Sequence, residues 1–517
     1  MMARKKNFLC ALSTLAWLVL TLFVVPSLGE GDDDVNDAIL NDIGQRSFVD
    51  SETGKLTLRH HTPPTPTRPY NSKQHRNQQQ HRHNGAHVGV SSSIFSSPST
   101  TTAMPITTTT TTTLIDGPIL CPEPCSCLGT LVDCSRRDLT SIPADLPVWV
   151  TILELQQNSI NNVNANSFAL LRQLKQLDLS HNKIRSLSGD ADGNGVFDSL
   201  VALTELKLNK NELSSFPRIG RDKLQHLRQL HLHKNRITNV TKDDLSALTR
   251  LETLDLNHNL IRRVDNAFPA DCRLRQLLLA NNRLSGFDQD TFLNLGQLET
   301  LKLSKNELKD KLPRELFVTT GNLLTLDLSR NKLREVEGLT FYGLRKLRQL
   351  RLRRNRIGVL GDGCFWGLER LENLHLDHNN VTTINKKWTY GLGKMKKLTL
   401  THNQVSRIHV ESFEFTEALE EMDLSYNRLR TIDEDTFDDL AALQILRLGH
   451  NQISHISEAA FRRLPHLDTL DLSHNKISTT IEDVQGVFGG LDRLSKIDLA
   501  DNEIKSIAKK AFVGLER

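Results

Sequence analysis

The stretch LTELKLNKNELSSF (Leu203–Phe216) contains the pattern from which the rest of the fold follows. It returns as LRQLHLHKNRITNV (Leu227–Val240) and as LQILRLGHNQISHI (Leu443–Ile456). All three fit L-x-x-L-x-L-x-x-N-x-(L or I), and ten of the fourteen intervals between successive pattern asparagines are 24 residues. A period held from residue 158 to residue 502 predicts an array of stacked, identical structural units.

The chemistry of each position in the pattern predicts how one unit folds. In L-x-L the two leucines point inward from a short strand, and the residue between them faces solvent. One coil cannot cover its own leucines, so neighbouring coils must stack. The asparagine amide offers a donor and an acceptor to the backbone of adjacent coils. The later phenylalanines Phe365, Phe437, Phe461 and Phe512 are expected to fill the opposite side.

These features predict an α/β-type leucine-rich repeat solenoid, a curved horseshoe with a parallel β-sheet on its concave face. We expect fifteen repeats over residues 150–517, with a concave sheet on the order of 70 Å long at ~4.8 Å per strand. The pattern asparagines number fifteen. They are Asn158, Asn182, Asn211, Asn235, Asn259, Asn282, Asn306, Asn331, Asn355, Asn379, Asn403, Asn427, Asn451, Asn475 and Asn502.

The first 120 residues have a different character. Arg4, Lys5 and Lys6 precede an apolar run, Phe8–Val25, and small residues end at Gly29. This predicts a signal peptide over residues 1–29, with an uncleaved signal anchor as the alternative. Residues 30–120 are rich in His, Pro and Thr and predict a disordered, O-glycosylated stalk, although their histidines also permit transition-metal binding. A net charge of +4 in 517 residues argues against a nucleic-acid partner.

Four cysteines cluster at the start of the ordered region, at Cys121, Cys125, Cys127 and Cys134. In an exported chain this spacing favours two disulfides over a tetrahedral zinc site, and the spacing alone leaves three pairings open. The segment 121–149 resembles the N-terminal cysteine cap of extracellular leucine-rich repeat proteins. That resemblance implies the pairs Cys121–Cys127 and Cys125–Cys134.

The C-terminal third resembles a more specific family. GLTFYGL (Gly338–Leu344), CFWGLERLENLHLDHN (Cys364–Asn379) and TIEDVQGVFGGLDRLSKIDLADNEIKSIAKKAFVGLER (Thr480–Arg517) are similar to the leucine-rich repeats and immunoglobulin-like domains family. The resemblance implies a single-pass cell-surface protein that associates with receptor tyrosine kinases and restrains growth-factor signalling. It also implies further domains and a transmembrane helix after Arg517, so the sequence is interpreted as an N-terminal fragment.

The sequence predicts no catalytic set, no phosphate loop, no cofactor and no small-molecule substrate. Ser, His and Asp recur as repeat residues rather than as an oriented triad. A 29-residue interval contains Asp190, Asp192, Asn194 and Asp198 at calcium-loop spacing, but Val201 stands where a bidentate Glu is required. We therefore expect a surface insertion without a strong calcium site. Cys272 and Cys364 lie four repeats apart and are expected not to pair.

The predicted partner is a protein, with glycans as a further possibility, and the concave face is the predicted contact surface. Its candidate residues are Arg351, Arg353, Arg354, His375 and Asp423. The arginines indicate either a solvated face or a contact for an acidic partner or sulfated glycan. A column of rings before the asparagines (His378, His402, Tyr426, His450 and His474) is either repeat filler or a pH-sensitive surface. N-glycosylation is expected at Asn239 and Asn380. A matrix or adhesion protein is the alternative function.

Overall fold

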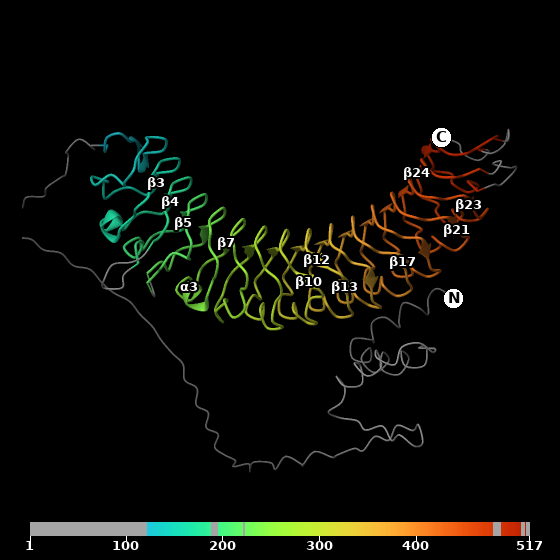
Figure 1. Cartoon of the computed structure of the whole chain (residues 1–517), viewed down its shortest axis with the longest axis horizontal. Coiled ribbons are helices and arrows are strands. Elements are labelled where there is room, and N and C mark those ends of the chain that lie inside the picture. Colours follow the sequence, from blue (N-terminus) through green and yellow to red (C-terminus); the bar gives the residue numbers. More distant parts are fainter. Residues whose placement is uncertain (1–120, 188–194, 221–222, 479–486, 508–511, 513–517) are drawn as a thin grey trace, which may run out of the picture. The chain divides into compact units, whose positions relative to one another are not determined.

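The structure is a computed structural model that describes residues 121–187, 195–220, 223–478 and 487–507, together with Phe512. The predicted signal peptide and stalk lie outside the described residues. Within those residues the chain winds as a series of similar coils, with the strands on the inner side of the curve (Figure 1). No helix in the described part of the chain has the length and apolarity needed to cross a bilayer.

One sheet of seventeen strands runs through the described repeats. Strands β1 and β2 belong to the N-terminal cap and pair antiparallel, and the other fifteen continue from β2 in parallel and in chain order. The strands are β1 (Ser126–Leu128), β2 (Leu131–Asp133), β3 (Ile152–Glu154), β4 (Gln176–Asp178), β5 (Glu205–Lys207), β6 (Gln229–His231), β7 (Thr253–Asp255), β8 (Gln276–Leu278), β9 (Thr300–Lys302), β11 (Thr325–Asp327), β14 (Gln349–Arg351), β16 (Asn373–His375), β18 (Lys397–Thr399), β20 (Glu421–Asp423), β22 (Ile445–Arg447), β24 (Thr469–Asp471) and β25 (Lys496–Asp498).

Short two-stranded parallel sheets form where the coils turn away from the main sheet. They pair β10 (Lys309–Asp310) with β12 (Lys332–Leu333), and β13 (Glu335–Val336) with β15 (Val359–Leu360). Two more pair β17 (Thr383–Ile384) with β19 (Arg407–Ile408), and β21 (Thr431–Ile432) with β23 (His455–Ile456). The described helices are one turn each, η3 (Ala165–Phe168) and α3 (Lys242–Ser246).

The leucine columns produce the register of the sheet. Leu326 lies opposite Leu301 on one side and Leu350 on the other, and all three are fully buried. The same column passes through both irregular intervals, because Leu177 pairs with Leu206 and Leu470 pairs with Ile497. The extra residues of those intervals therefore leave the main sheet in register.

The repeat asparagines form a hydrogen-bonded ladder between coils. Asn355 donates through Nδ2 to the carbonyl of Leu328 at 3.0 Å and to that of Leu352 at 2.9 Å. Its Oδ1 accepts from the backbone N–H of Leu333 at 3.2 Å. The ladder begins at the cap, where Asn158 donates to the carbonyl of Cys134. The expected role of the asparagine is confirmed.

The outer side of each coil is filled by a column of phenylalanines. Phe317, Phe341 and Phe365 are buried and stack with ring centroids 6.0–6.2 Å apart. Phe437 and Phe461 continue the column, and Phe512, which is 37% exposed, stacks on Phe488 with ring centroids 6.0 Å apart. Parallel strands on the inner side are only ~4.8 Å apart. The larger outer spacing bends the array toward its sheet, which is the predicted horseshoe curvature (Figure 1).

The cap is closed by disulfides Cys121–Cys127 and Cys125–Cys134, as the family resemblance implied. All four thiols are consumed, so they do not form the alternative zinc site. Cys134 and Val132 are fully buried against the first repeat. The cap thereby covers the apolar end of the array that the first coil would otherwise expose.

Replacing Asn355 with Ala is expected to destabilise the protein by about 2–4 kcal/mol, because buried peptide groups of Leu328, Leu352 and Leu333 lose their partner at ~1–3 kcal/mol each with partial relaxation. Urea unfolding followed by circular dichroism measures the change. The control is Asn162→Ala, since Asn162 is exposed and makes no hydrogen bond within the described residues. Equal stability of the two variants would contradict a ladder that holds the coils together.

Candidate functional site

The concave face carries the side chains that alternate with the buried leucines. Arg353 and His375 of adjacent coils are brought together there. Arg353 Nε lies 2.7 Å from Asp377 Oδ2, and its NH2 lies 2.7 Å from His375 Nδ1. The Thr399 hydroxyl donates to Asp377 Oδ2 at 2.8 Å, and its oxygen lies 3.0 Å from His375 Nδ1. The result is a closed polar network across three coils.

His375, one of the predicted concave-face contact residues, belongs to this network. Its side chain is buried among Arg353, Thr399 and Asp377, with 7% of the residue exposed. Burial, followed by the positive charge of Arg353, lowers the pKa of His375 to about 4. The imidazole is therefore neutral at physiological pH and acts as a hydrogen-bonding element of the sheet surface.

The other predicted contact residues lie at different positions relative to this network. Arg351 is half-buried on β14, and its side chain makes no ion pair within the described residues. Asp423, two strands from His375 in the sheet, accepts a hydrogen bond from the N–H of Ser425 at 3.0 Å. Arg354 is exposed and lies outside the sheet, immediately before the ladder residue Asn355. Arg351, Arg353 and His375 are therefore neighbours, because Arg351 is the register partner of His375, whereas Arg354 and Asp423 lie apart from them.

Arg354 belongs to a column at the rim of the concave sheet, which we call the edge column. It consists of the residue before each ladder asparagine, and all fifteen such residues have a left-handed backbone, with φ between 51° and 61°. They are Gln157, His181, Lys210, Lys234, His258, Asn281, Lys305, Arg330, Arg354, His378, His402, Tyr426, His450, His474 and Asp501. The tight turn into the ladder imposes this conformation, which is unusual for residues other than glycine, asparagine and aspartate.

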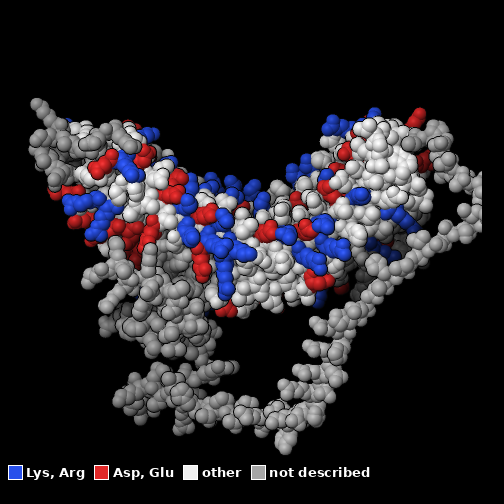
Figure 2. All heavy atoms as spheres, turned by 180° about the vertical axis from the view of Figure 1, so that it is seen from behind, with Lys and Arg blue, Asp and Glu red and all other residues white. Residues whose placement is uncertain are grey.

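The first part of the edge column is cationic. Lys234, Lys305 and Arg330 are exposed, and no carboxylate lies within ion-pair distance of them in the described part of the chain. Elsewhere on the coils, by contrast, cations pair with a carboxylate of the next coil. Examples are Arg228–Glu252, Arg275–Glu299, Arg348–Glu372 and Lys396–Glu420, all at 2.6–2.9 Å. Figure 2 shows basic and acidic side chains interspersed on one face of the molecule. The unpaired cations make the rim an anion-accepting edge.

The second part of the edge column is an aromatic stack. The centroids of His378, His402, Tyr426, His450 and His474 follow one another at 4.3, 4.2, 4.1 and 4.0 Å. Arg354 contacts His378 at its start, and Asp501 lies 3.2 Å from His474 at its end. The predicted ring column is therefore a continuous physical contact, and its spacing is the shortest of the aromatic columns because it lies on the inner side of the curve.

Sequence reasoning recognised these rings but missed the cations that precede them. The signal was present, because Lys210, Lys234, Lys305 and Arg330 occupy the same position in the pattern as the histidines. It also missed a concave cluster of His231, His233 and Asp255, whose ligand atoms all lie within 4.8 Å of one another. The sequence clue was a pair of histidines flanking a leucine on one strand, next to an aspartate 24 residues after the first of them.

Other candidate positions have structural roles. Asp198 of the predicted calcium loop accepts backbone N–H groups of Gly195 at 2.7 Å and Gly220 at 2.9 Å, while Asp190, Asp192 and Asn194 lie outside the described residues. Cys272 and Cys364 are unpaired. Cys364 is fully buried, and burial raises the pKa of its thiol far above the usual range.

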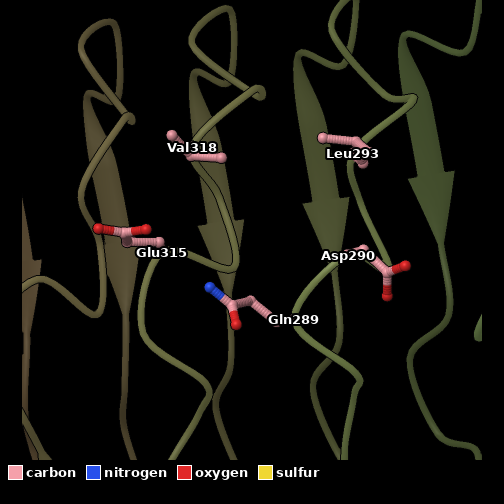
Figure 3. A pocket seen from close by; sticks show the side chains of 5 residues that line it. All are labelled: Gln289, Asp290, Leu293, Glu315 and Val318. Carbon is pink, nitrogen blue, oxygen red and sulfur yellow. The ribbon is translucent and has the colours of Figure 1, made fainter. Parts of the chain in front are cut away.

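The hollows of the surface are shallow. One of about 360 Å³ lies between two coils and is lined by Gln289, Asp290, Leu293, Glu315 and Val318 (Figure 3). Leu293 is 53% exposed and Val318 47% exposed, so this hollow does not enclose a small ligand. The broad sheet and its rim are better suited to a macromolecule.

Comparison with known families agrees with this geometry. The leucine rich repeat model matches residues 150–213 and 225–268, and overlapping matches cover 272–477, together more than half of the chain. The leucine rich repeat N-terminal domain model matches residues 121–147. The chain belongs to the leucine-rich repeat family. Members of this repeat family are usually non-catalytic scaffolds.

Similar individual proteins match parts of this leucine-rich repeat chain. Mouse leucine-rich repeats and immunoglobulin-like domains protein 3 is 42% identical over 67 residues, 13% of this chain and 6% of the relative. Rat osteomodulin is 41% identical over 100 residues, 19% of this chain and 23% of the relative. The chain thus aligns with less than a quarter of either relative.

Solved structures share the fold over a larger part of the chain. A leucine-rich repeat protein of Leptospira interrogans has a TM-score of 0.57 and 25% identity, covering 73% of this chain and 91% of that one. The Drosophila Toll–Spätzle complex in its glycosylated form has a TM-score of 0.53 and 22% identity, covering 69% and 48%. The second likeness concerns the fold alone.

The Arg353→Gln substitution is expected to raise the pKa of His375 from about 4 toward its unfolded value near 6.5, because it removes a neighbouring positive charge. Asp377→Asn should lower it further. In the wild type the folded pKa lies below the unfolded one, so His375 lowers stability as pH falls from about 6.5 to about 4, and Arg353→Gln should narrow that window. Histidine-selective NMR titration measures both shifts, with Arg356→Gln as control. Wild-type titration near 6.5 would refute the burial argument.

Both predicted sequons lie on the surface. Asn380 and Asn239 are exposed in the turns after their ladder asparagines. We expect N-glycan on Asn380, and on Asn239 at equal or lower occupancy. Peptide mass spectrometry of secreted protein, with and without glycosidase, measures the occupancy, and Asn380→Gln should remove one glycan. An unmodified Asn380 in every molecule would show that exposure of this turn is insufficient.

Proposed function

We propose that this leucine-rich repeat chain is an extracellular scaffold that binds a growth-factor receptor ectodomain, of the receptor tyrosine kinase type, and restrains its signalling. The observation that supports the binding role is the uninterrupted parallel sheet. Of its seventeen strands, two belong to the cap and fifteen to the repeats. A surface of that length, without a deep pocket in the described residues, suits another folded protein. The disulfide cap supports an oxidising, extracellular environment.

The receptor-modulating role is supported by the similarity to the leucine-rich repeats and immunoglobulin-like domains protein of mouse. The motifs after Gly338, and the insertion in Thr480–Asp492, are the parts of this chain that resemble that family.

A matrix protein that binds sulfated glycans is the second candidate. The specific observation in its favour is the cationic part of the edge column, where Lys234, Lys305 and Arg330 have no carboxylate partner within the described residues. Arginine and lysine in a row attract sulfate groups through charge-assisted hydrogen bonds.

Capture of purified receptor ectodomains by the full chain tests the first proposal. Lys302 and Arg351 are half-buried on the concave face and free of ion pairs within the described residues. The double change Lys302→Glu with Arg351→Glu should weaken receptor capture about tenfold or more, through like-charge contacts with the partner. Arg370→Glu is the matched control, since Arg370 is exposed in the loop before β16. Receptor phosphorylation in cells provides the functional readout.

Heparin retention separates the two candidates. The edge change Lys305→Glu with Arg330→Glu should reduce heparin retention if the rim binds sulfated glycans, and the remaining retention should fall with salt because exposed charges are screened. Retention by heparin or matrix alone, with no receptor captured and no change in receptor phosphorylation, would overturn the receptor proposal in favour of the matrix protein.

A further inference from the structure

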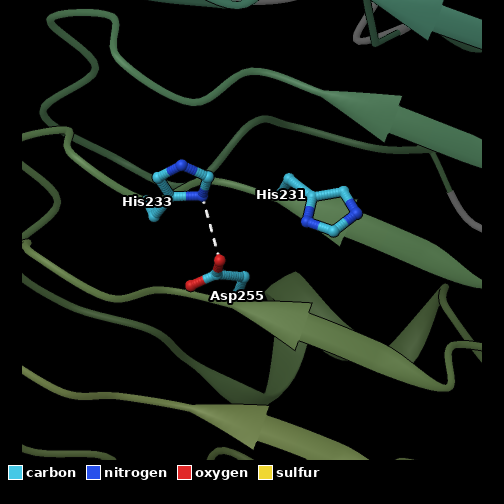
Figure 4. Close-up of side chains that lie close together, drawn as sticks. All are labelled: His231, His233 and Asp255. Atoms are coloured by element: carbon cyan, nitrogen blue, oxygen red, sulfur yellow. Dashed lines mark ion pairs between the residues drawn. The ribbon is translucent and has the colours of Figure 1, made fainter.

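His231, His233 and Asp255 form a cluster on the concave face, next to edge-column residue Lys234 (Figure 4). His231 ends β6, His233 follows it two residues later, and Asp255 ends the neighbouring strand β7. Residues two apart on a strand point to the same face, and His231 and Asp255 are direct partners in the sheet register. The fold therefore delivers two imidazoles and one carboxylate to the same side of two adjacent strands.

The carboxylate is held in place by its own coil. Asp255 Oδ1 accepts the backbone N–H of Asn257 at 3.0 Å, and Oδ2 lies 2.9 Å from His233 Nδ1. Aspartates in other coils make the first of these contacts too, as Asp327 does with Ser329 and Asp423 with Ser425. The second contact, which turns the outer oxygen toward histidine on the neighbouring coil, distinguishes Asp255.

The surroundings favour a bound cation. The side chains of His231, His233 and Asp255 are 22%, 28% and 13% exposed, so solvent screening is weak. Glu205 Oε1 lies 3.8 Å from His231 Nε2 and is neutralised by Lys207 at 3.1 Å. Because the charges of Glu205 and Lys207 cancel, a cluster with neutral imidazoles has a net charge of one negative unit, which comes from Asp255.

The same sheet contains an internal comparison. At His375 and Asp377, a related imidazole and carboxylate are bridged by a side-chain cation, because the Arg353 guanidinium reaches both at 2.7 Å. No lysine or arginine lies within ion-pair distance of Asp255 in the described part of the chain. The two clusters thus differ in one respect: Asp377 has an arginine as its cation partner, whereas Asp255 has no lysine or arginine partner among the described residues.

We propose that His231, His233 and Asp255 bind a divalent transition-metal ion of the zinc type on the concave face. Imidazole nitrogen and carboxylate oxygen are established zinc ligands, and ligand atoms around tetrahedral zinc lie ~3.3 Å apart for bonds of ~2.0–2.1 Å. The three ligand atoms here are all within 4.8 Å of one another, so side-chain rotations bring them to that spacing. Water completes the coordination on the open side of the sheet.

Zinc titration of the full chain by calorimetry tests this proposal. Histidines of residues 30–120 contribute a background that is common to all variants, so the comparison between variants is decisive. His231→Gln, His233→Gln and Asp255→Asn should each abolish the binding of one zinc equivalent, or lower its affinity by more than ~10-fold. Losing only the hydrogen-bond partner of a metal ligand typically lowers the affinity by ~10-fold or more. His226→Gln, an exposed histidine preceding the same strand, should retain that equivalent.

Thermal unfolding gives a second readout, and chemical protection gives a third that uses the wild-type protein alone. Zinc that binds only the folded cluster raises the melting temperature of the wild type, and this rise should disappear in Asp255→Asn. In the wild type, zinc should protect His231 and His233 from diethylpyrocarbonate, as mapped by mass spectrometry, but not His226. Equal zinc stoichiometry and equal affinity in all four variants, or unprotected His231 and His233 at saturating zinc, would overturn the proposed site.

Discussion

The hydrogen bonds of the ladder asparagines are the constraint on which the other features depend. Each amide satisfies carbonyls of two successive coils and an N–H of the preceding one, as Asn355 does for Leu328, Leu352 and Leu333. Because these peptide groups are buried, an unpaired group would lower stability markedly. The ladder fixes the distance and rotation between coils. The spacing within the sheet, the phenylalanine column and the edge column follows from it.

The sequence predicted the features that a repeated local rule determines. The fifteen strands, the asparagine ladder, the phenylalanine column and the disulfide cap all follow from residue type at a fixed register, or from the cap's resemblance to known ones. The features it did not predict depend on which side chains meet across coils. Nothing in the one-dimensional pattern shows that Arg353 contacts both His375 and Asp377, or that these neighbours bury His375.

The two halves of the edge column illustrate the same limit. Rings before Asn379 to Asn475 were visible in the sequence as a column, but their contact at 4.0–4.3 Å results from curvature, which compresses the inner side. Whether a surface cation forms an ion pair likewise depends on whether the next coil has a carboxylate at the adjacent position. Arg348 meets Glu372, whereas Arg330 has no such neighbour among the described residues. Potential function on this scaffold is therefore decided by pairs of coils rather than by single repeats.

The left-handed residue in every coil has a thermodynamic consequence for the whole array. A non-glycine residue held in that region raises the energy of its coil by roughly 1 kcal/mol or more. The penalty is paid within a coil, while the ladder and sheet contacts that offset it lie between coils. In a nearest-neighbour description of the array, the folding free energy of a single coil is then unfavourable, and the interaction free energy between adjacent coils is strongly favourable. Such an array unfolds cooperatively over many coils, so unfolding of one interior coil destabilises coils that lie far from it in the array.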